Sequence, residues 1–455
     1  MPMVSVNPAT GETIQEYREM SPDDVTSILE AASSRFSEWR RSSFEERSRL
    51  MHRTAELMRE RSEEYSELMT REMGKAIRDS RSEIEKSAWV CDYYAEHAQA
   101  FLAREPAPTE ASNSFVSYRP LGVILAVMPW NFPFWQFFRF AAPALMAGNC
   151  SVLKHSSNVT GSALAIERLL RDAGYPEDVF RTLVIGSRQV ADVIRHPAVP
   201  AVTLTGSTPA GRAIASTAGQ ELKPCVLELG GSDPYIVLED ADLEHAARTC
   251  VTSRLFNSGQ SCIAAKRFIA VEKVADEFER LFMEEMRSRV MGDPMDDATQ
   301  VGPQARSDLR DELHQQVQES IEAGAVCLLG GEIPPGPGAY YPPTVLSNVK
   351  PGMPAYDDEL FGPVAAIIRA RDEAHAVRIA NDSFFGLGAA VFTRDLARGT
   401  RIAEEEINAG CVFVNEYVRS DPRLPFGGVK GSGFGRELSS FGIREFVNIK
   451  GVWVR

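Results

Sequence analysis

The sequence predicts an α/β protein built on parallel sheets, and two observations lead to this prediction. From residue 122 to about 230, short β-rich runs alternate with helical patterns, and a second alternating region runs from about 231 to 430. Such alternation is typical of parallel sheets covered by helices on both faces, and these sheets bind ligands at the carboxyl ends of their strands. With 455 residues, the chain should divide into two or three domains.

The first hundred residues are expected to be helical. The segment SPDD at 21–24 offers a serine cap, a proline in the first turn and an acid at the third helical position, and SFEE at 43–46 repeats this capping logic. The helical pattern continues to about Leu102, where REPAPTE interrupts it. The N-terminal part should therefore supply helices to the fold.

Five strands are expected between residues 122 and 230, in the runs GVILAV, NCSVLK, RTLVI, AVTLT and CVLEL. The helical patterns between them are FFRFAAPALMAG, SALAIERLLRDAG, RQVADVIRH and PAGRAIASTAG. The strand AVTLT runs directly into GSTPAG at the start of a helix, where exposed backbone N–H groups favour a phosphate. The turn is thus a candidate anion site, although many strand–helix turns with a Gly-Ser pair bind nothing, and the spacing alone leaves both interpretations open.

Two further strands are expected outside these regions. They are SNSFVSYRPLG at 112–122 and the C-terminal EFVNIKGVWVR. Lone strands of this kind often pair with each other or extend the sheet of a partner subunit. We therefore expect a homo-oligomer, either a dimer or a tetramer.

Charge and cysteine usage exclude several classes of protein. The net charge of −14 argues against nucleic acid or an anionic membrane as the main partner. The seven cysteines are scattered singly, as is typical of reduced thiols in a reducing compartment. The N-terminus shows no secretory signal, so a cytoplasmic protein is expected.

One apolar segment approaches the length of a membrane span. Residues 121–138 carry no charge, but Pro129 and Pro133 would break a helix at mid-membrane. A buried strand that runs into a Pro-rich turn is the better interpretation. We therefore expect no membrane partner.

Familiar site motifs are absent or incomplete. The seven histidines form no HExxH motif or His-Cys cluster, so no metal is expected. The GSTPAG turn has the glycine spacing of a Walker A loop, but Arg212 and Ala213 follow where Lys and Ser/Thr should stand. The glycine-rich GGVKGSGFGRE lies outside any strand–helix unit and is expected to form a flexible or tightly turned loop.

Cys262 lies among small residues in FNSGQSCIAAKR rather than in an apolar run. A structural cysteine is usually a small buried hydrophobe, whereas a reactive one needs room for a substrate and a stabilised thiolate. The local sequence alone leaves both interpretations open.

Seven motifs in a fixed order resolve this question by resemblance. They are VMPWNFP, VLKHSSN, TLTGSTPAG, LELGG, NSGQSCIAAKR, ELFGPV and PFGGVKGSGFGRE. Over essentially its full length the chain resembles the NAD(P)-dependent aldehyde dehydrogenase superfamily, and within it the short bacterial succinate-semialdehyde dehydrogenases. The resemblance implies a Rossmann-type cofactor domain, an α/β catalytic domain and a small β oligomerisation element. The corresponding ranges are 1–110 with 126–230, 231–430, and 111–125 with 437–455.

The resemblance also assigns catalytic roles. Cys262 would be the nucleophile that attacks the aldehyde carbonyl, and Asn131 would stabilise the oxyanion together with the Cys262 backbone N–H. Glu228 would be the general base that activates water to hydrolyse the thioester. Taken alone, Glu228 could be a strand-end carboxylate in an ion pair, and Asn131 a turn former.

Cofactor contacts are implied by the same matches. The residues expected at the cofactor are Pro129, Trp130, Lys154, Ser157, Gly206, Ser207, Glu359 and Phe361. The commonest family pattern is Lys-Pro-Ser-Glu, whereas this chain has Lys154-His155-Ser156-Ser157. A carboxylate at the fourth position would accept hydrogen bonds from a ribose 2′-hydroxyl and repel a 2′-phosphate. Ser157 removes that repulsion, so we expect NADP to be preferred, with NAD as the alternative.

Arg139 is the expected determinant of the substrate. In the succinate-semialdehyde group an arginine at this position holds the distal carboxylate, and an Arg–carboxylate pair selects an anionic aldehyde. Ser420 and its neighbour Arg419 are expected as further contacts. The alternative is that Arg139 pairs with an internal carboxylate.

The expected reaction is NADP-linked oxidation of succinate semialdehyde to succinate. The same chemistry on another small or acidic aldehyde, such as glutarate semialdehyde, is the nearest alternative. A catalytically inactive family member that serves as a binding or structural protein is a second one, although the presence of Cys262, Glu228 and Asn131 argues against it.

Overall fold

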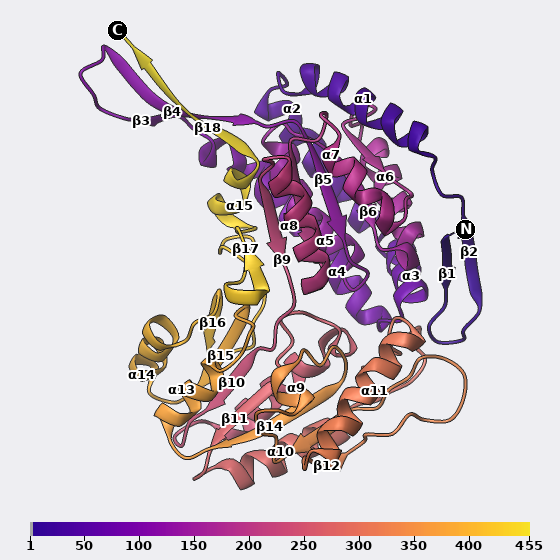
Figure 1. Cartoon of the computed structure of the whole chain (residues 1–455), viewed down its shortest axis with the longest axis vertical. Helices are drawn as coiled ribbons and strands as arrows, with labels where there is room; N and C mark the ends of the chain where they lie inside the picture. The colour runs from indigo at the N-terminus through magenta and orange to yellow at the C-terminus, as the bar shows by residue number, and fades with distance from the viewer. Residues whose placement is uncertain (1–2) are drawn as a thin grey trace.

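Two α/β bodies, each built on its own sheet, and a thin projecting β ribbon make up the molecule (Figure 1). The computed structural model describes residues 3–455. The first body contains most of the N-terminal half of the chain, and the second is formed by residues after about 230. The predicted α/β class with parallel sheets is confirmed.

The first body contains a six-stranded sheet in the order β17-β9-β8-β5-β6-β7. Its five parallel strands are the five that the sequence predicts, and β17 joins the edge antiparallel to β9. The order reverses between β5 and β8, which is where such sheets open a crevice for a ligand. The strands are β5 (Val123–Met128), β6 (Cys150–His155), β7 (Phe180–Thr182), β8 (Ala201–Thr205), β9 (Cys225–Glu228) and β17 (Gly433–Phe434).

Helices α1 to α8 belong to this body. The predicted caps are present, because Ser21 and Asp24 form a capping box and the Ser43 hydroxyl accepts a hydrogen bond from the Glu46 N–H. The helices are α1 (Pro22–Trp39), α2 (Phe44–Glu60), α3 (Ser62–Met73), α4 (Ile77–Phe101), α5 (Pro133–Met146), α6 (Thr160–Asp172), α7 (Val190–Arg195) and α8 (Thr208–Gln220).

The helical prediction is wrong for the first residues that the structure describes. Strands β1 (Met3–Val6) and β2 (Thr13–Tyr17) form an antiparallel hairpin. The hairpin is fastened by a contact that no local pattern reveals: the Ser5 hydroxyl donates a hydrogen bond of 2.8 Å to the buried Glu72 carboxylate on α3. Tertiary contact therefore decides the conformation of this segment.

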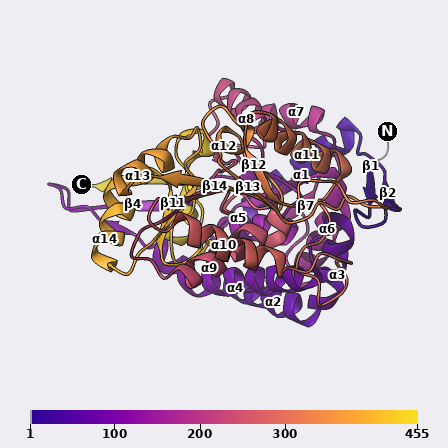
Figure 2. The ribbon, with the colours of Figure 1, turned by 90° about the horizontal axis from the view of Figure 1, so that it is seen from below.

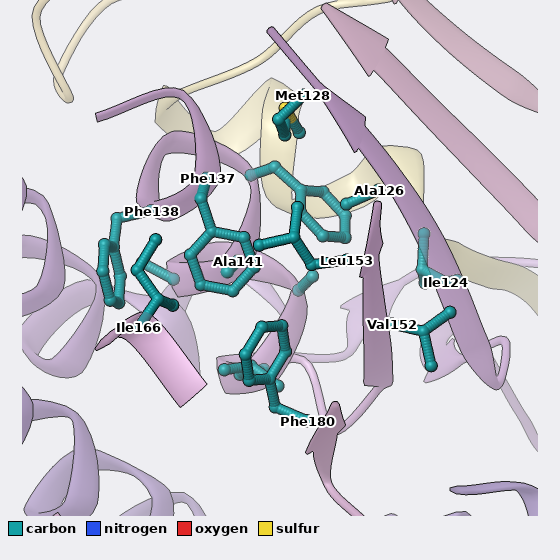
Figure 3. Packing of buried hydrophobic residues seen from close by; sticks show 14 of the residues in the cluster. Ile124, Ala126, Met128, Phe137, Phe138, Ala141, Val152, Leu153, Ile166 and Phe180 are labelled. Atoms are coloured by element: carbon teal, nitrogen blue, oxygen red, sulfur yellow. The ribbon is translucent and has the colours of Figure 1, made fainter. Parts of the chain in front are cut away.

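Helix α5 is buried on every side in the core of the first body (Figure 3). Its Phe137 packs on Phe180 of β7, with ring centroids 4.7 Å apart. Ile124 of β5 and Ile166 of α6 belong to the same cluster. A helix that is apolar all round must be enclosed in this way, which explains why residues 121–138 resemble a membrane span.

The second body contains a seven-stranded sheet in the order β12-β13-β14-β11-β10-β15-β16. All neighbours are parallel except β12 and β13. The strands are β10 (Pro234–Val237), β11 (Arg267–Val271), β12 (Val326–Leu329), β13 (Thr344–Ser347), β14 (Val364–Ala370), β15 (Gly388–Phe392) and β16 (Cys411–Val414). The helices are α9 (Leu243–Leu255), α10 (Ala275–Arg287), α11 (Ser307–Glu322), α12 (Pro354–Asp357), α13 (Glu373–Asn381) and α14 (Leu396–Arg401).

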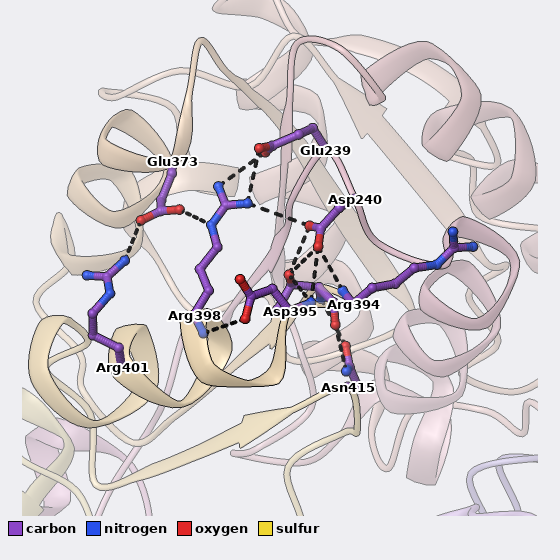
Figure 4. A network of polar contacts seen from close by, with 9 residues as sticks. Glu239, Asp240, Glu373, Arg394, Asp395, Arg398, Arg401 and Asn415 are labelled. Atoms are coloured by element: carbon purple, nitrogen blue, oxygen red, sulfur yellow. Dashed lines mark hydrogen bonds and ion pairs between the residues drawn. The ribbon is translucent and has the colours of Figure 1, made fainter.

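A polar network fastens the helices of the second body to the ends of its strands (Figure 4). Arg398 on α14 forms an ion pair of 3.0 Å with Glu239 after β10, and a second one with Glu373 on α13. Asp240 accepts hydrogen bonds from the Thr393 hydroxyl and the Arg394 N–H. Because several charges share partners, the network fixes side chains that isolated surface pairs would leave mobile.

The projecting ribbon is formed by β3 (Glu105–Pro106), β4 (Asn113–Pro120) and β18 (Val447–Val454). The two lone strands of the sequence pair with each other antiparallel. Helix α15 (Ser439–Glu445) precedes β18, and residues 123–125 belong to β5, so the ribbon covers less than the ranges 111–125 and 437–455. Figure 2 shows the ribbon leaving the bodies on the side opposite to the β1–β2 hairpin.

Across residues 3–455, none of the helices has both the length and the apolar character that a membrane crossing requires.

Removing the ring of Phe137 should destabilise the protein. This side chain is fully buried, so Phe137→Ala is expected to lower the free energy of unfolding by about 3–5 kcal/mol. Phe441→Ala is the control, because Phe441 is 61% exposed and its loss should change stability by no more than ~0.5 kcal/mol. Thermal and denaturant unfolding of both variants would measure this, and equal stabilities would contradict the packing described for α5.

Candidate active site

Cys262 lies where two cavities meet. The larger cavity has a volume of about 340 Å³ and opens at the carboxyl ends of β5 and β8, with α11 on its far side. The smaller one has a volume of about 90 Å³ and is enclosed by α4, α5 and the loop around residue 420. Cys262 and Gln136 line both cavities. A group on the sulfur can therefore be approached from two sides.

The loop that carries Cys262 has a strained backbone. Asn257, Ser258 and Gly259 have consecutive left-handed φ angles of 55°, 56° and 76°. Side chains hold this conformation, because the Asn257 amide donates to the Asn131 carbonyl at 2.9 Å and the Ser258 hydroxyl accepts from the Gly302 N–H at 2.9 Å. Strain of this kind persists only where the surroundings over-determine it, and such places are often functional.

Lys266 fixes the backbone of the same loop. Its buried ammonium donates hydrogen bonds to the carbonyls of Ser261 (2.8 Å) and Cys262 (2.7 Å). It also pairs with Glu359 at 3.4 Å. No role for Lys266 was predicted, although its place in the motif NSGQSCIAAKR, four residues after the cysteine, is a signal that points to it.

The thiol of Cys262 is protonated in the enclosed site. Burial raises its pKa to about 12, and the negative charges of Glu359 and Glu228 act in the same direction. The positive charges of Arg139 and Lys266 oppose this effect. Formation of the thiolate therefore requires a base or an additional positive charge nearby.

Asn131 is oriented by hydrogen bonds on both sides of its amide. Its Nδ2 donates to the Gln260 carbonyl at 3.0 Å, and its Oδ1 accepts from Gln136 Nε2 at 3.0 Å. An amide NH₂ has two donors, so one remains available on the side of the cavity that Asn131 lines. The structure thus brings Asn131 to the cavity that also contains Cys262.

Glu228 lies near this site but lines neither of its two cavities. It ends β9 and is buried, and neither carboxylate oxygen has a hydrogen-bond partner within the described residues. Burial raises the pKa of Glu228 well above its ordinary value, an effect that the charge of Arg139 opposes. The carboxyl of Glu228 therefore holds its proton more readily than a solvent-exposed one, and it acts as a base only in its ionised form.

Six of the eight expected cofactor residues line the larger cavity. They are Pro129, Trp130, Gly206, Ser207, Glu359 and Phe361. The rings of Trp130 and Phe361 meet edge to face at 5.7 Å, and the Glu359 carboxylate accepts a hydrogen bond of 2.9 Å from the Gly231 N–H. Helix α8 begins after Ser207 and has no side-chain cap, so its first N–H groups are free to bind an anion. These features fit a dinucleotide with its phosphates at α8.

Lys154 and Ser157 lie beyond this cavity along the same edge of the sheet. Lys154 is the penultimate residue of β6 and the register partner of Val127 on β5, and Ser157 is exposed in the turn that follows. No carboxylate of residues 3–455 lies within ion-pair distance of Lys154. Its charge is therefore uncompensated at a place that a ligand extending from α8 along the sheet would reach.

The smaller cavity receives two of the three expected substrate residues, Arg139 and Ser420. The Arg139 guanidinium forms a buried ion pair with Glu437, which is the alternative that the sequence left open. It also donates to the Thr205 hydroxyl at 3.1 Å. The structure does not bring Arg419 to the cavity, because its side chain is exposed and lies 3.9 Å from Glu416.

The sequence profile of the aldehyde dehydrogenase family matches residues 1–452. The chain belongs to this family. Among curated relatives, the chain is 50% identical to "Succinate-semialdehyde dehydrogenase [NADP(+)] 1" of Mycobacterium ulcerans, over the full length of both. It is 49% identical to "Succinate semialdehyde dehydrogenase [NAD(P)+] Sad" of Escherichia coli, over 99% of this chain and 97% of the relative.

Solved structures agree with this aldehyde dehydrogenase fold. The succinic semialdehyde dehydrogenase of Streptococcus pyogenes, solved with NADP+, is 36% identical and superimposes with a TM-score of 0.97 over 99% of both chains. The structure of Gox0499, described in terms of cofactor and substrate selection, is 38% identical and gives 0.98 over the full length of both.

Adding a methyl group at residue 259 should strongly reduce the catalytic turnover of this protein. The substitution Gly259→Ala is strained by the φ of +76°, and its Cβ would overlap the Gly362 carbonyl. The loop must shift, and a displacement of Cys262 by about 1 Å is expected to lower turnover roughly a hundredfold. Gly219→Ala on α8 is the control, because no atom lies within 4 Å of its Cβ. Equal turnover in both variants would show that the loop geometry does not matter.

Proposed function

We propose that the chain catalyses NADP-linked oxidation of succinate semialdehyde to succinate. The observation that most directly supports this proposal is the position of Cys262 between two unlike cavities. One cavity offers an uncapped helix terminus and aromatic walls that fit a dinucleotide, and the other is lined by the cationic side chains of Lys86 and Arg139. The names of the relatives support this combination of cofactor and substrate.

In this proposal, the Cys262 thiol first loses its proton to solvent, and the sulfur then adds to the aldehyde carbon. The new C–S bond turns the carbonyl oxygen into an oxyanion, which the free donor of Asn131 and the Cys262 backbone N–H stabilise. Bound NADP+ supplies the acceptor for the hydride that leaves this carbon. The product on the protein is a thioester of Cys262.

Glu228 then serves as the base for deacylation. Once ionised, it accepts a proton from water, whose oxygen bonds to the acyl carbon as the C–S bond breaks. The thiol of Cys262 regains a proton, and succinate leaves. The lack of any hydrogen-bond partner for the Glu228 carboxylate within residues 3–455 suits this role, because no bond within the protein has to break before it binds water.

The preference for NADP rests on Ser157 and Lys154. An exposed serine presents no carboxylate to repel a 2′-phosphate, and an uncompensated ammonium nearby attracts one. The first body is accordingly proposed as the cofactor domain, the second as the catalytic domain, and the β4–β18 ribbon as the surface on which subunits assemble. Ile449 and Trp453 on the ribbon are 61% and 53% exposed, as an assembly surface would require.

The function is tested by NADP reduction with purified protein and succinate semialdehyde, using Cys262→Ala as the control. We expect turnover with the native protein and none with the variant, because the variant lacks the nucleophile. Turnover only with neutral aldehydes would keep the chemistry but overturn the substrate. Turnover that survives in Cys262→Ala would overturn the mechanism.

A carboxylate at position 157 should reverse the cofactor preference. Ser157→Glu is expected to lower the kcat/KM ratio of NADP to NAD by roughly a hundredfold, because it places a negative charge against the 2′-phosphate. Ser157→Ala is the matched variant, since it removes the hydroxyl without adding charge and should leave NADP preferred. Steady-state kinetics with both cofactors would measure the ratios, and an unchanged ratio in Ser157→Glu would place the selection elsewhere.

A further inference from the structure

Lys86 is a cationic residue of the substrate cavity that the sequence motifs do not indicate. It belongs to α4, and its half-buried side chain reaches the wall of the cavity that also contains Cys262. The ammonium donates a hydrogen bond of 2.9 Å to the Ser420 hydroxyl and lies 4.3 Å from the centre of the Trp135 ring. Within residues 3–455, no carboxylate lies within 4 Å of it.

The other charges around this cavity are already paired. Arg139 forms its ion pair with Glu437. Glu83 pairs with Lys75, and its second oxygen accepts hydrogen bonds from the backbone N–H groups of Phe134 and Trp135 at the start of α5. Among the charged residues that line this cavity, Lys86 is therefore the one without an ion-pair partner in the described chain.

We propose that Lys86 and Ser420 bind the distal carboxylate of the acidic aldehyde, an inference that rests on the proposed function. An ammonium has three donors, and Ser420 uses one of them, so two remain for a carboxylate. The Ser420 oxygen accepts from Lys86, which leaves the hydroxyl proton free to donate to the same carboxylate. The Trp135 ring supports the ammonium from its face.

Arg139 lines the same cavity and keeps the role that its motif implies. Its guanidinium has five donors, and the ion pair with Glu437 through Nε and the hydrogen bond from Nη2 to Thr205 leave Nη1 free for a carboxylate. Lys86 is therefore an additional contact beside Arg139, and it is the one that the motifs do not indicate.

The protonation of Lys86 makes the assignment visible in a pH profile. The pKa of Lys86 is lowered to about 7, mainly by burial; the charges of Arg139 and Arg419 act in the same direction, whereas those of Glu83 and Asp421 oppose it. Because only the ammonium attracts a carboxylate, binding of an anionic aldehyde should weaken as the pH rises through 7. Binding of a neutral aldehyde should not depend on the protonation of Lys86.

The experiment compares succinate semialdehyde with butanal, which has the same four carbons and a methyl group in place of the carboxylate. For Lys86→Met, we expect the ratio of kcat/KM for succinate semialdehyde to kcat/KM for butanal to fall at least about thirtyfold, mainly through KM for the acidic substrate. Lys273→Met is the control, because Lys273 is exposed and remote from both cavities, and its ratio should not change.

The native protein provides a second, independent measurement. Its ratio should fall as the pH rises above 7, and Lys86→Arg should abolish this fall, because arginine stays protonated. The titrations of Cys262 and Glu228 cancel in the ratio, since both substrates use them. This measurement decides the matter even if Lys86→Met does not fold.

The outcomes separate the two proposals. Native protein that does not oxidise succinate semialdehyde overturns the proposed function and this inference with it. Native protein that oxidises it, with an unchanged ratio in Lys86→Met or a native ratio that is flat across pH 6–9, overturns the role of Lys86 alone.

Discussion

Close backbone contacts around the Cys262 loop leave no room for side chains, and the candidate active site depends on this constraint. Gly259 packs against the Gly362 carbonyl, and a Cβ on Gly231 would lie 2.7 Å from the Cys262 carbonyl. Backbone from the segment between β9 and β10, from the cysteine loop and from the segment before β14 thus meets directly. These close backbone contacts hold Cys262 in position. They also require the left-handed backbone conformation of the residues that precede it in the loop.

Buried charges around the site divide into two kinds. Lys266 with Glu359, Arg139 with Glu437 and Lys75 with Glu83 form ion pairs that hold backbone segments together. Within residues 3–455, Glu228 and Lys86 have no ion-pair partner of opposite charge. Leaving a charge unpaired in a buried place is costly, so such groups are natural candidates for contact with substrate and water. The pairs supply rigidity, whereas we propose a role in reactivity for Glu228 and a role in selection for Lys86.

The sequence predicted the parts of the fold that have a local cause. Strands β5 to β9 are buried on both faces, so they appear as apolar runs, and the caps at Ser21 and Ser43 lie next to the helices they start. The β1–β2 hairpin depends on Glu72, far along the chain, and was missed. The contact between Lys86 and Ser420 spans 334 positions, so no spacing rule could reveal it. Motifs indicated Cys262 and Asn131, but they did not show that Arg139 forms an ion pair with Glu437.

The pairing of Arg139 with Glu437 also orders the events of biosynthesis. The two residues are 298 positions apart, so Arg139 leaves the ribosome roughly 15–60 s before its partner at ordinary rates of translation. During this interval the guanidinium of Arg139 has no Glu437 to pair with, and the neighbouring Phe140 on α5 also lacks its packing partner Phe446. This part of the first body is therefore completed only when the final segment arrives. Closure of the wall beside the substrate cavity belongs to the end of chain synthesis, even though most of that wall is encoded in the first third of the sequence.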